Sequence, residues 1–174
     1  MYVKLLVWLT ALLVDSCCFG VVASVDQRCY TFIYDDSSCP KTWLNWGNSC
    51  YKITETRFTW SNARDECRNL GGVLAAPSSD QENEFITQLL ADGIVWIDCN
   101  DQDVEGTWEC REDNAEVAYR NWYDGEPNNG AGGKYEDCAV VSIWNNKRQW
   151  HDLSCIHRLE RAVCKMAGRP VLPV

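Results

Sequence analysis

The sequence predicts an α+β fold in which two helices precede a long polar loop region and several short antiparallel strands. Three observations lead to this expectation: two segments with helix caps and apolar stripes, a polar segment from residue 98 to 135, and nine cysteines spread between residues 29 and 164. A chain of 174 residues can build one ordinary domain with its own core. We therefore expect a single disulfide-stapled domain.

Residues 1–23 have the pattern of a secretory signal peptide. Lys4 precedes an apolar run over residues 5–14, and small residues follow as far as Gly20 or Ala23. The run is about half of the roughly 20 residues that span a bilayer, and Asp15 interrupts it. A signal peptide is favoured over a membrane anchor, so we expect a secreted protein with no membrane insertion. Residues 24–38 then form an N-terminal extension.

Two helices are predicted from their caps and apolar stripes. The first follows Thr59, a favourable N-cap residue, and ends at Gly71. Its apolar positions share one face: Trp60, Ala63, Cys67 and Leu70. The second follows Ser79, and Glu82 three residues later predicts a capping box. Its core stripe contains Phe85, Ile86, Leu89 and Leu90.

Short strands are predicted on both sides of a long polar segment. A turn at residues 47–48 leads into a strand that ends near Ile53, and residues 95–97, 139–143 and 161–164 are apolar enough to lie in the core. Asn145-Asn146-Lys147 predicts a hairpin turn into Gln149-Trp150. Residues 98–135 have little apolar periodicity, and such a long loop in a compact domain is usually functional.

The cysteine count indicates an oxidising compartment and a disulfide framework. Of eleven cysteines, Cys17 and Cys18 lie in the expected signal peptide, which leaves an odd number. An odd count leaves one thiol free or paired between chains. No Cys-x-x-Cys spacing is present, which argues against a zinc site.

Charge and motifs argue against two classes of function. The net charge is −9, and an acidic protein does not attract nucleic acid or an anionic membrane surface. The two histidines, His151 and His157, belong to no recognisable nucleophile–base arrangement, and the cysteines are better explained as disulfides. We therefore expect a binding protein and not an enzyme.

Oxygen-bearing side chains are concentrated between Glu126 and Asp152. The segment contains Glu126-Pro127-Asn128-Asn129, then Glu136-Asp137, and then His151-Asp152. Carboxylates and amides at this density repel one another unless a hard cation lies among them, and Ca²⁺ takes about 6–8 oxygen ligands. A proline between two candidate ligands also suggests a cis peptide bond. The sequence therefore predicts a calcium site.

From Cys39 to Lys165 the chain resembles the C-type lectin-like domain. The resemblance rests on the order and spacing of separate marks: Cys39 with Cys50-Tyr51, Cys67, Trp96-Ile97, Glu105-Gly106-Thr107-Trp108, Asn121-Trp122, Glu126-Pro127-Asn128, Cys138, Cys155 and Cys164. It implies a domain over residues 39–166 with a long calcium-binding loop region, followed by a tail at residues 167–174. Among the aromatic side chains in the loop, Trp122 and Tyr123 are candidates to grip a ligand, although Trp122 is more often core in this fold.

The resemblance implies three disulfides, Cys39–Cys50, Cys67–Cys164 and Cys138–Cys155. We infer a fourth, Cys99–Cys110, because both cysteines lie in one loop region. Cys29 is then left over. It is either a free or capped thiol in the extension or an interchain disulfide that links a homodimer.

In sugar-binding members of the family, one Ca²⁺ bridges protein and sugar. The matching positions here are Glu126, Asn128 and Glu136, followed by the pair after Trp150. That pair is usually Asn-Asp, whereas this chain has His151-Asp152, and imidazole is a poor ligand for a hard cation. Asp152 could keep its contact to the ion. His151 either donates to a sugar hydroxyl or is a loop residue with no ligand role.

An auxiliary calcium site is implied by Asp101 and Glu105, which lie four residues apart. They match the family's auxiliary ligands together with Asn129, Glu136 and Asp137.

Glu-Pro-Asn goes in the family with equatorial 3- and 4-hydroxyls. We therefore expect a calcium-dependent lectin for glycans of the mannose, N-acetylglucosamine or fucose type. The alternative is a calcium-stabilised domain that binds protein or mineral and matrix surfaces without recognising sugar.

Overall fold

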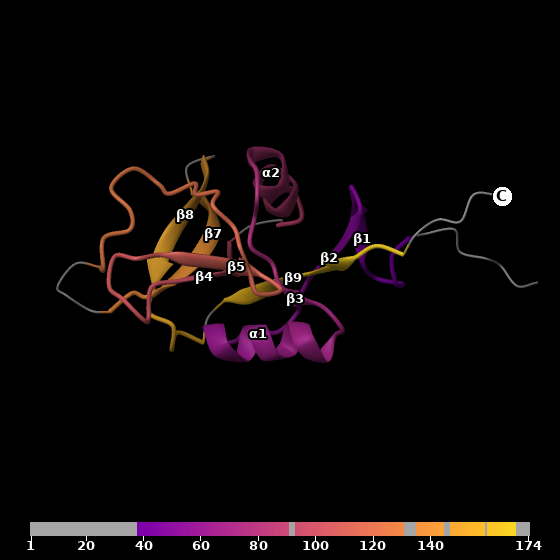
Figure 1. Cartoon of the computed structure of the whole chain (residues 1–174), viewed down its shortest axis with the longest axis horizontal. Coiled ribbons are helices and arrows are strands. Elements are labelled where there is room, and N and C mark those ends of the chain that lie inside the picture. Colours follow the sequence, from indigo (N-terminus) through magenta and orange to yellow (C-terminus); the bar gives the residue numbers. More distant parts are fainter. Residues whose placement is uncertain (1–37, 91–92, 131–134, 145–146, 159, 170–174) are drawn as a thin grey trace, which may run out of the picture. The chain divides into compact units, whose positions relative to one another are not determined.

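The computed structural model in Figure 1 describes residues 38–90, 93–130, 135–144, 147–158 and 160–169. The chain divides into two units, Met1–Asp35 and Asp36–Val174. The expected signal peptide, most of the extension and Cys29 lie outside the described residues, as does the end of the expected tail. The described residues all belong to the second unit.

Both predicted helices are present and begin where their caps predicted. Helix α1 (Trp60–Asn69) follows Thr59, whose hydroxyl accepts from the Asn62 amide, and helix α2 (Asp80–Gln88) follows Ser79, whose hydroxyl accepts from the Glu82 amide. The apolar stripe of each helix faces the core. Among the described residues, neither helix nor any other is long and apolar enough to cross a bilayer.

The capping box on α2 forms only in part. Ser79 makes its half of the box, but the Glu82 carboxylate turns inward and accepts from Lys165 Nζ at 2.8 Å and from the Tyr51 hydroxyl at 2.6 Å. Its other oxygen accepts from the Ser78 amide at 2.9 Å. Glu82 is 1% exposed, so this carboxylate is part of a buried polar network instead of a surface cap.

The described strands join into one hydrogen-bonded sheet system. They are β1 (Leu44–Trp46), β2 (Ser49–Ile53), β3 (Val73–Leu74), β4 (Ile94–Asn100), β5 (Glu109–Glu112), β6 (Ala115–Glu116), β7 (Cys138–Trp144), β8 (Lys147–Leu153) and β9 (Arg161–Ala167). The order runs β1-β2-β9-β4-β5-β6, with β3 on β9 and the β7–β8 hairpin on β4. All pairings are antiparallel except β4 with β9, and this parallel pair joins the expected small sheets. The turn expected at Asn145-Asn146 lies outside the described residues.

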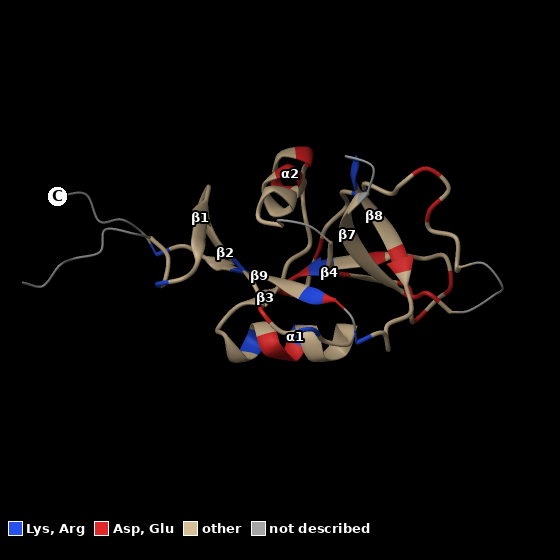
Figure 2. Ribbon diagram, turned by 180° about the vertical axis from the view of Figure 1, so that it is seen from behind, with Lys and Arg blue, Asp and Glu red and all other residues tan. Residues whose placement is uncertain are grey.

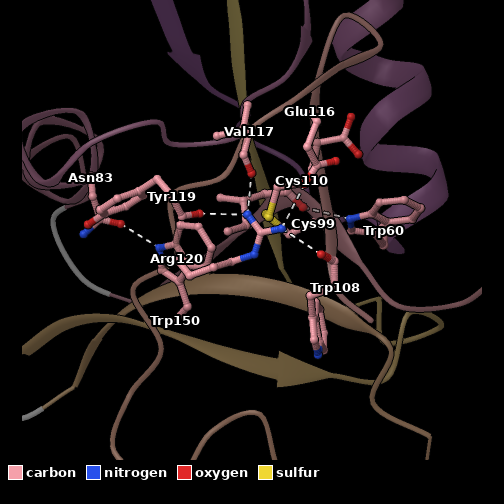
Figure 3. The surroundings of a disulfide bond; sticks show 12 residues. Trp60, Asn83, Cys99, Trp108, Cys110, Glu116, Val117, Tyr119, Arg120 and Trp150 are labelled. Carbon is pink, nitrogen blue, oxygen red and sulfur yellow. Dashed lines mark hydrogen bonds and ion pairs between the residues drawn. A yellow bond between two sulfur atoms is a disulfide. The ribbon is translucent and has the colours of Figure 1, made fainter. Parts of the chain in front are cut away.

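The segment that was expected to be a long loop contains a short hairpin. Strands β5 and β6 pair with each other, and Cys99 on β4 is directly opposite Cys110 on β5. Figure 3 shows how the chain beyond β6 is held to this hairpin: the Arg120 guanidinium donates to the carbonyls of Trp108 (2.7 Å) and Val117. A disulfide and a single arginine therefore order a segment that has little apolar periodicity.

Two apolar clusters support the site. One surrounds Trp96 and Cys164 beneath α1, and the other surrounds Trp150, Ile86 and Val141 beneath α2. Trp150 is fully buried, and its indole N–H donates to the Asn83 side chain of α2 at 2.7 Å. This contact fixes strand β8 to the core immediately before His151 and Asp152, which lie next to the loop region.

The structure contains all four expected disulfides, Cys39–Cys50, Cys67–Cys164, Cys99–Cys110 and Cys138–Cys155. Cys67–Cys164 closes the longest loop, with a sequence separation of 97 residues, and links α1 to β9. In the chain-entropy treatment, closing a loop of this length stabilises the fold by about 4–5 kcal/mol. The α+β fold with two helices, antiparallel strands and disulfide staples is confirmed.

Candidate functional site

The loop that carries Glu126 and Asn128 is shaped by a cis peptide bond between Glu126 and Pro127, as expected. The side chains on either side of the proline meet, because the Asn128 amide donates to Glu126 Oε2 at 2.7 Å. Glu126 is partly buried and Asn128 is exposed. The pair therefore presents an acid and an amide together at the protein surface.

Asp152, on β8, fastens this loop to the sheet. Its carboxylate accepts from the backbone amide of Asn128 at 3.0 and 3.1 Å and from that of Asn129 at 2.7 Å. Asp152 is 3% exposed, and the buried Trp150 lies two residues before it on the strand. The predicted residue Asp152 is thus brought next to Glu126 and Asn128, as the resemblance implied.

Burial and two neighbouring acids raise the pKa of Glu126. Burial first, and then the hydrogen bond and charge of Asp152 and the charge of Glu136, raise the pKa of Glu126 to about 8. Gly130 fits against this cluster only because it lacks a side chain: a Cβ there would lie 2.9 Å from the Glu136 carboxylate. Figure 2 shows acidic segments gathered in the loops beside β7 and β8.

His151 lies in strand β8 and not in a loop, and it pairs with Val140 of β7. Its ring stacks on Tyr123 with centroids 5.0 Å apart, and its Nδ1 lies 3.2 Å from Glu126 Oε1. Burial lowers the pKa of His151, so the neutral ring is favoured. Among the described residues, nothing hydrogen-bonds to its buried Nε2. The imidazole therefore contacts a candidate ligand, Glu126.

The auxiliary residues form a second acidic group. The Asn129 amide donates to Glu105 Oε1 at 2.6 Å, and its oxygen accepts from the Glu136 backbone amide at 2.9 Å. Asp101 is 4% exposed, and its Oδ2 accepts from the Gly106 amide at 2.8 Å. Its buried Oδ1 has no hydrogen-bond partner among the described residues.

Two carboxyl groups of this second group, those of Asp101 and Asp137, have raised pKa values. Burial raises the pKa of Asp101 and of Asp137, and the charge of Glu105 raises both further. A buried carboxylate oxygen without a donor is costly, and a cation would relieve that cost.

The donor set suits a hard cation, although it is not closed around one. Carboxylates and side-chain amides supply the oxygen donors that Ca²⁺ takes. Among the described residues, however, no three carboxylate, imidazole or thiolate groups converge as a preformed metal cage. A bound cation would have to draw these side chains together, with amide and ligand oxygens completing its shell.

Lys147 was not among the candidates from the sequence. Its Nζ lies over the Tyr123 ring, 4.9 Å from the centroid, and Tyr123 in turn stacks on His151. The sequence placed Lys147 in a predicted hairpin turn, whereas the structure places it on β8 four residues before His151, so that the two side chains share a face. Trp122, by contrast, packs between Trp108 and Trp150 and belongs to the core.

Comparison with known proteins identifies the domain. The family model "Lectin C-type domain" matches residues 56–166. The low affinity immunoglobulin epsilon Fc receptor of Mus musculus is 36% identical over 129 residues, which are 73% of this chain and 37% of the receptor. The chain thus spans little more than a third of the length of that relative.

Solved structures agree on the fold. The carbohydrate-recognition domain of cow CD23, crystallised in the presence of GlcNAc2Man3 oligosaccharide, is 31% identical with a TM-score of 0.69 over 77% of this chain and 99% of that domain. A calcium-independent type II antifreeze protein is also 31% identical, with a TM-score of 0.67 over 76% of this chain and 96% of that protein. The chain belongs to the family of proteins with a C-type lectin domain.

Proposed function

We propose that this protein is a calcium-dependent lectin that binds glycans of the mannose, N-acetylglucosamine or fucose type. The observation that carries the proposal is the meeting of Glu126 and Asn128 across a cis proline, beside Asp152 and in the field of Glu136. Domains of this family are carbohydrate-binding modules and are generally not enzymes.

Glu126, Asn128, Glu136 and Asp152 are the residues that would hold the ion. When bound, Ca²⁺ would offer coordination positions to two neighbouring sugar hydroxyls. The carboxylates of Glu126 and Glu136 can accept hydrogen bonds from those hydroxyls, and the Asn128 amide can donate one. The order acid then amide in Glu126-Pro127-Asn128 is the basis for a mannose-type preference.

His151 positions Glu126 in this proposal and does not bind the ion. With the ring neutral, an Nδ1–H group donates to Glu126 Oε1 and fixes the direction of that carboxylate. Such a group acts through Glu126, so we expect His151→Ala to weaken glycan binding and His151→Asn to retain it. Loss of binding in both variants would instead assign His151 a direct contact to the sugar.

A glycan column tests the lectin function directly. The purified protein should be retained on immobilised mannan in calcium and released by EDTA or free mannose. Glu126→Gln should pass through the column, whereas Glu109→Gln, which removes a half-buried acid of β5 that pairs with Arg111, should be retained. Retention that survives EDTA would refute calcium dependence.

The second candidate function is binding to a protein, mineral or matrix surface without sugar recognition. His151 in place of the usual asparagine favours it, as does the likeness to a calcium-independent antifreeze protein. Failure to bind any member of a broad glycan array in calcium, together with binding to a mineral or protein surface, would establish it.

An auxiliary calcium ion is proposed at Asp101, Glu105, Asn129, Glu136 and Asp137. The buried Asp101 oxygen and the raised pKa values of Asp101 and Asp137 support it. Asp101→Asn should reduce the calcium-induced gain in thermal stability, and an unchanged gain would remove Asp101 from the set.

Secretion and Cys29-linked dimerisation are also proposed, on the sequence pattern alone. A single sugar on calcium typically binds at about millimolar affinity, so two linked sites would raise avidity. Non-reducing electrophoresis of the secreted protein should show a dimer that Cys29→Ser abolishes. A monomer in both lanes would end the dimer proposal.

A further inference from the structure

Lys147 is a cation without a described carboxylate partner at the border of an acidic site. Its side chain is exposed, and the contact described for its ammonium is the face of Tyr123 at 4.9 Å. An ammonium over an aromatic ring is held by the ring's negative face, and none of the three N–H donors of Lys147 has a hydrogen-bond acceptor in the described parts of the chain. The Tyr123 ring therefore holds the Lys147 ammonium in position but does not neutralise its charge.

Three contacts in series connect this ammonium to Glu126, and the first is its contact with the Tyr123 ring. Tyr123 stacks on His151 with an interplanar angle of 22°, and His151 Nδ1 lies 3.2 Å from Glu126 Oε1. One aromatic ring thus separates Lys147 from His151. Because side chains alternate along a strand, Lys147 and His151 project from the same face of β8.

The neighbouring basic residue, Arg148, has a carboxylate partner in the protein. Arg148 projects from the other face of β8, and its guanidinium pairs with Glu84 of α2 at 2.9 Å. The positive charge of Arg148 is therefore paired with a carboxylate of the same chain. Of these two adjacent basic residues, Lys147 is the one on the face of β8 that carries His151, the residue beside Glu126.

We propose that Lys147, presented on Tyr123, is a specificity-determining residue that selects glycans with an anionic group beside the sugar held at the candidate calcium site. The group is a sulfate ester or a carboxylate. The inference rests on the proposed lectin function. A chain of net charge −9 repels such ligands at long range, so a local cation is needed for it to prefer them.

The expected effect is modest and depends on salt. Exposed ion pairs contribute enough to change affinity by about two- to fivefold. At about 0.1 M salt the Debye length is about 10 Å, so the preference should shrink as salt is raised. Contacts to a bound calcium ion are screened less, and neutral glycan binding should depend less on salt.

The test compares three immobilised ligands in calcium: a neutral mannose-type glycan, its sulfated form and its carboxylated form. Affinities are measured for the full chain and for Lys147→Gln, Lys147→Glu and the matched control Arg148→Gln. The readout is the ratio of anionic to neutral affinity, which is insensitive to a general loss of active protein. A thermal melt of each variant checks folding.

We expect a ratio of about two to five in the unaltered protein and in Arg148→Gln, about one in Lys147→Gln, and below one in Lys147→Glu. The arm with the higher ratio identifies sulfate or carboxylate as the preferred group. A ratio of one in the unaltered protein, or a ratio that Lys147→Gln leaves unchanged, overturns the inference while the lectin function stands. Failure of all three ligands to bind refutes the lectin function, and the inference falls with it.

Discussion

Glu82 in the core and Glu126 in the loop are both carboxylates withdrawn from water, yet their pKa values move in opposite directions. Burial opposes ionisation of Glu82, but hydrogen bonds from Lys165, Ser78 and Tyr51 lower its pKa below the ordinary value. At Glu126, burial and the neighbouring acids Asp152 and Glu136 raise the pKa to about 8.

The difference lies in where the compensating charge comes from. In the core, Lys165 is 7% exposed and reaches both Glu82 (2.8 Å) and Glu112 (2.7 Å), so the chain provides its own cation. Around Glu126, by contrast, the neighbours are the acids Asp152 and Glu136 and the amide of Asn128. The acid in the core has its compensating cation within the fold, whereas at Glu126 the neighbouring acids oppose ionisation.

The largest expected effect is in the core. Lys165→Met leaves Glu82 buried without its cation, and removing one partner of a buried ion pair costs about 3–5 kcal/mol. Urea unfolding should show that loss, whereas Lys41→Met, at an exposed position, should unfold like the original protein. A loss below about 1 kcal/mol would mean that the core acid does not depend on Lys165.

If calcium binds the acidic loop, it should raise the stability of the folded protein. A ligand at about 100 times its dissociation constant stabilises a folded protein by about 2.7 kcal/mol. Thermal melts in calcium and in EDTA should differ accordingly, and Glu126→Gln should reduce the difference. Equal melting temperatures in calcium and EDTA would show that the acidic loop holds no ion.

Proton linkage should distinguish the two glutamates further. Without metal, the folded pKa of Glu126 is about 8 against an ordinary 4.5, so between these values the native state binds more protons than the unfolded chain. Stability should therefore fall as pH rises through this window, by no more than about 1.4 kcal/mol per pH unit, and level off above it. Denaturation in EDTA at several pH values measures the slope.

Calcium requires the ionised acid, so saturating calcium should flatten that slope, and Glu126→Gln should remove the part due to this residue. If Glu126→Gln left the pH dependence of stability in EDTA unchanged, the proton would be bound by another acid of the cluster.

The smallest effect is expected at the surface. Arg148 and Glu84 form an ion pair whose side chains are 41% and 60% exposed. Exposed pairs contribute about 0–1 kcal/mol, so Arg148→Gln should change urea stability by about 0.5 kcal/mol or less. A loss comparable to that of Lys165→Met would show that burial does not govern the difference between ion pairs in this protein.

The elements that sequence predicted well are those with local signals. Thr59 and Ser79 cap their helices because a hydroxyl next to a free backbone amide needs no distant partner. The capping box predicted at Ser79 and Glu82 forms only in part, because the Glu82 carboxylate also binds Lys165, which lies 83 residues away and leaves no signal near Ser79. Glu126, Asn128 and Asp152 were brought together as the resemblance implied.

The rest of the site depended on how β8 meets the loop. No local pattern indicated that His151 would lie in a strand, stack on Tyr123 and contact Glu126. The β5–β6 hairpin was also missed, because it is held by a disulfide and by Arg120 instead of an apolar stripe.

The two backbone amides that donate to Asp152 give this site a spectroscopic reporter. The N–H groups of Asn128 and Asn129 both end on the same carboxylate, which is itself a candidate calcium ligand. Any cation that draws on Asp152 must share it with these two amides, so their proton chemical shifts and solvent-exchange rates should change together. Two resonances in an NMR spectrum would then follow occupancy of the site, with no sugar present and no label attached.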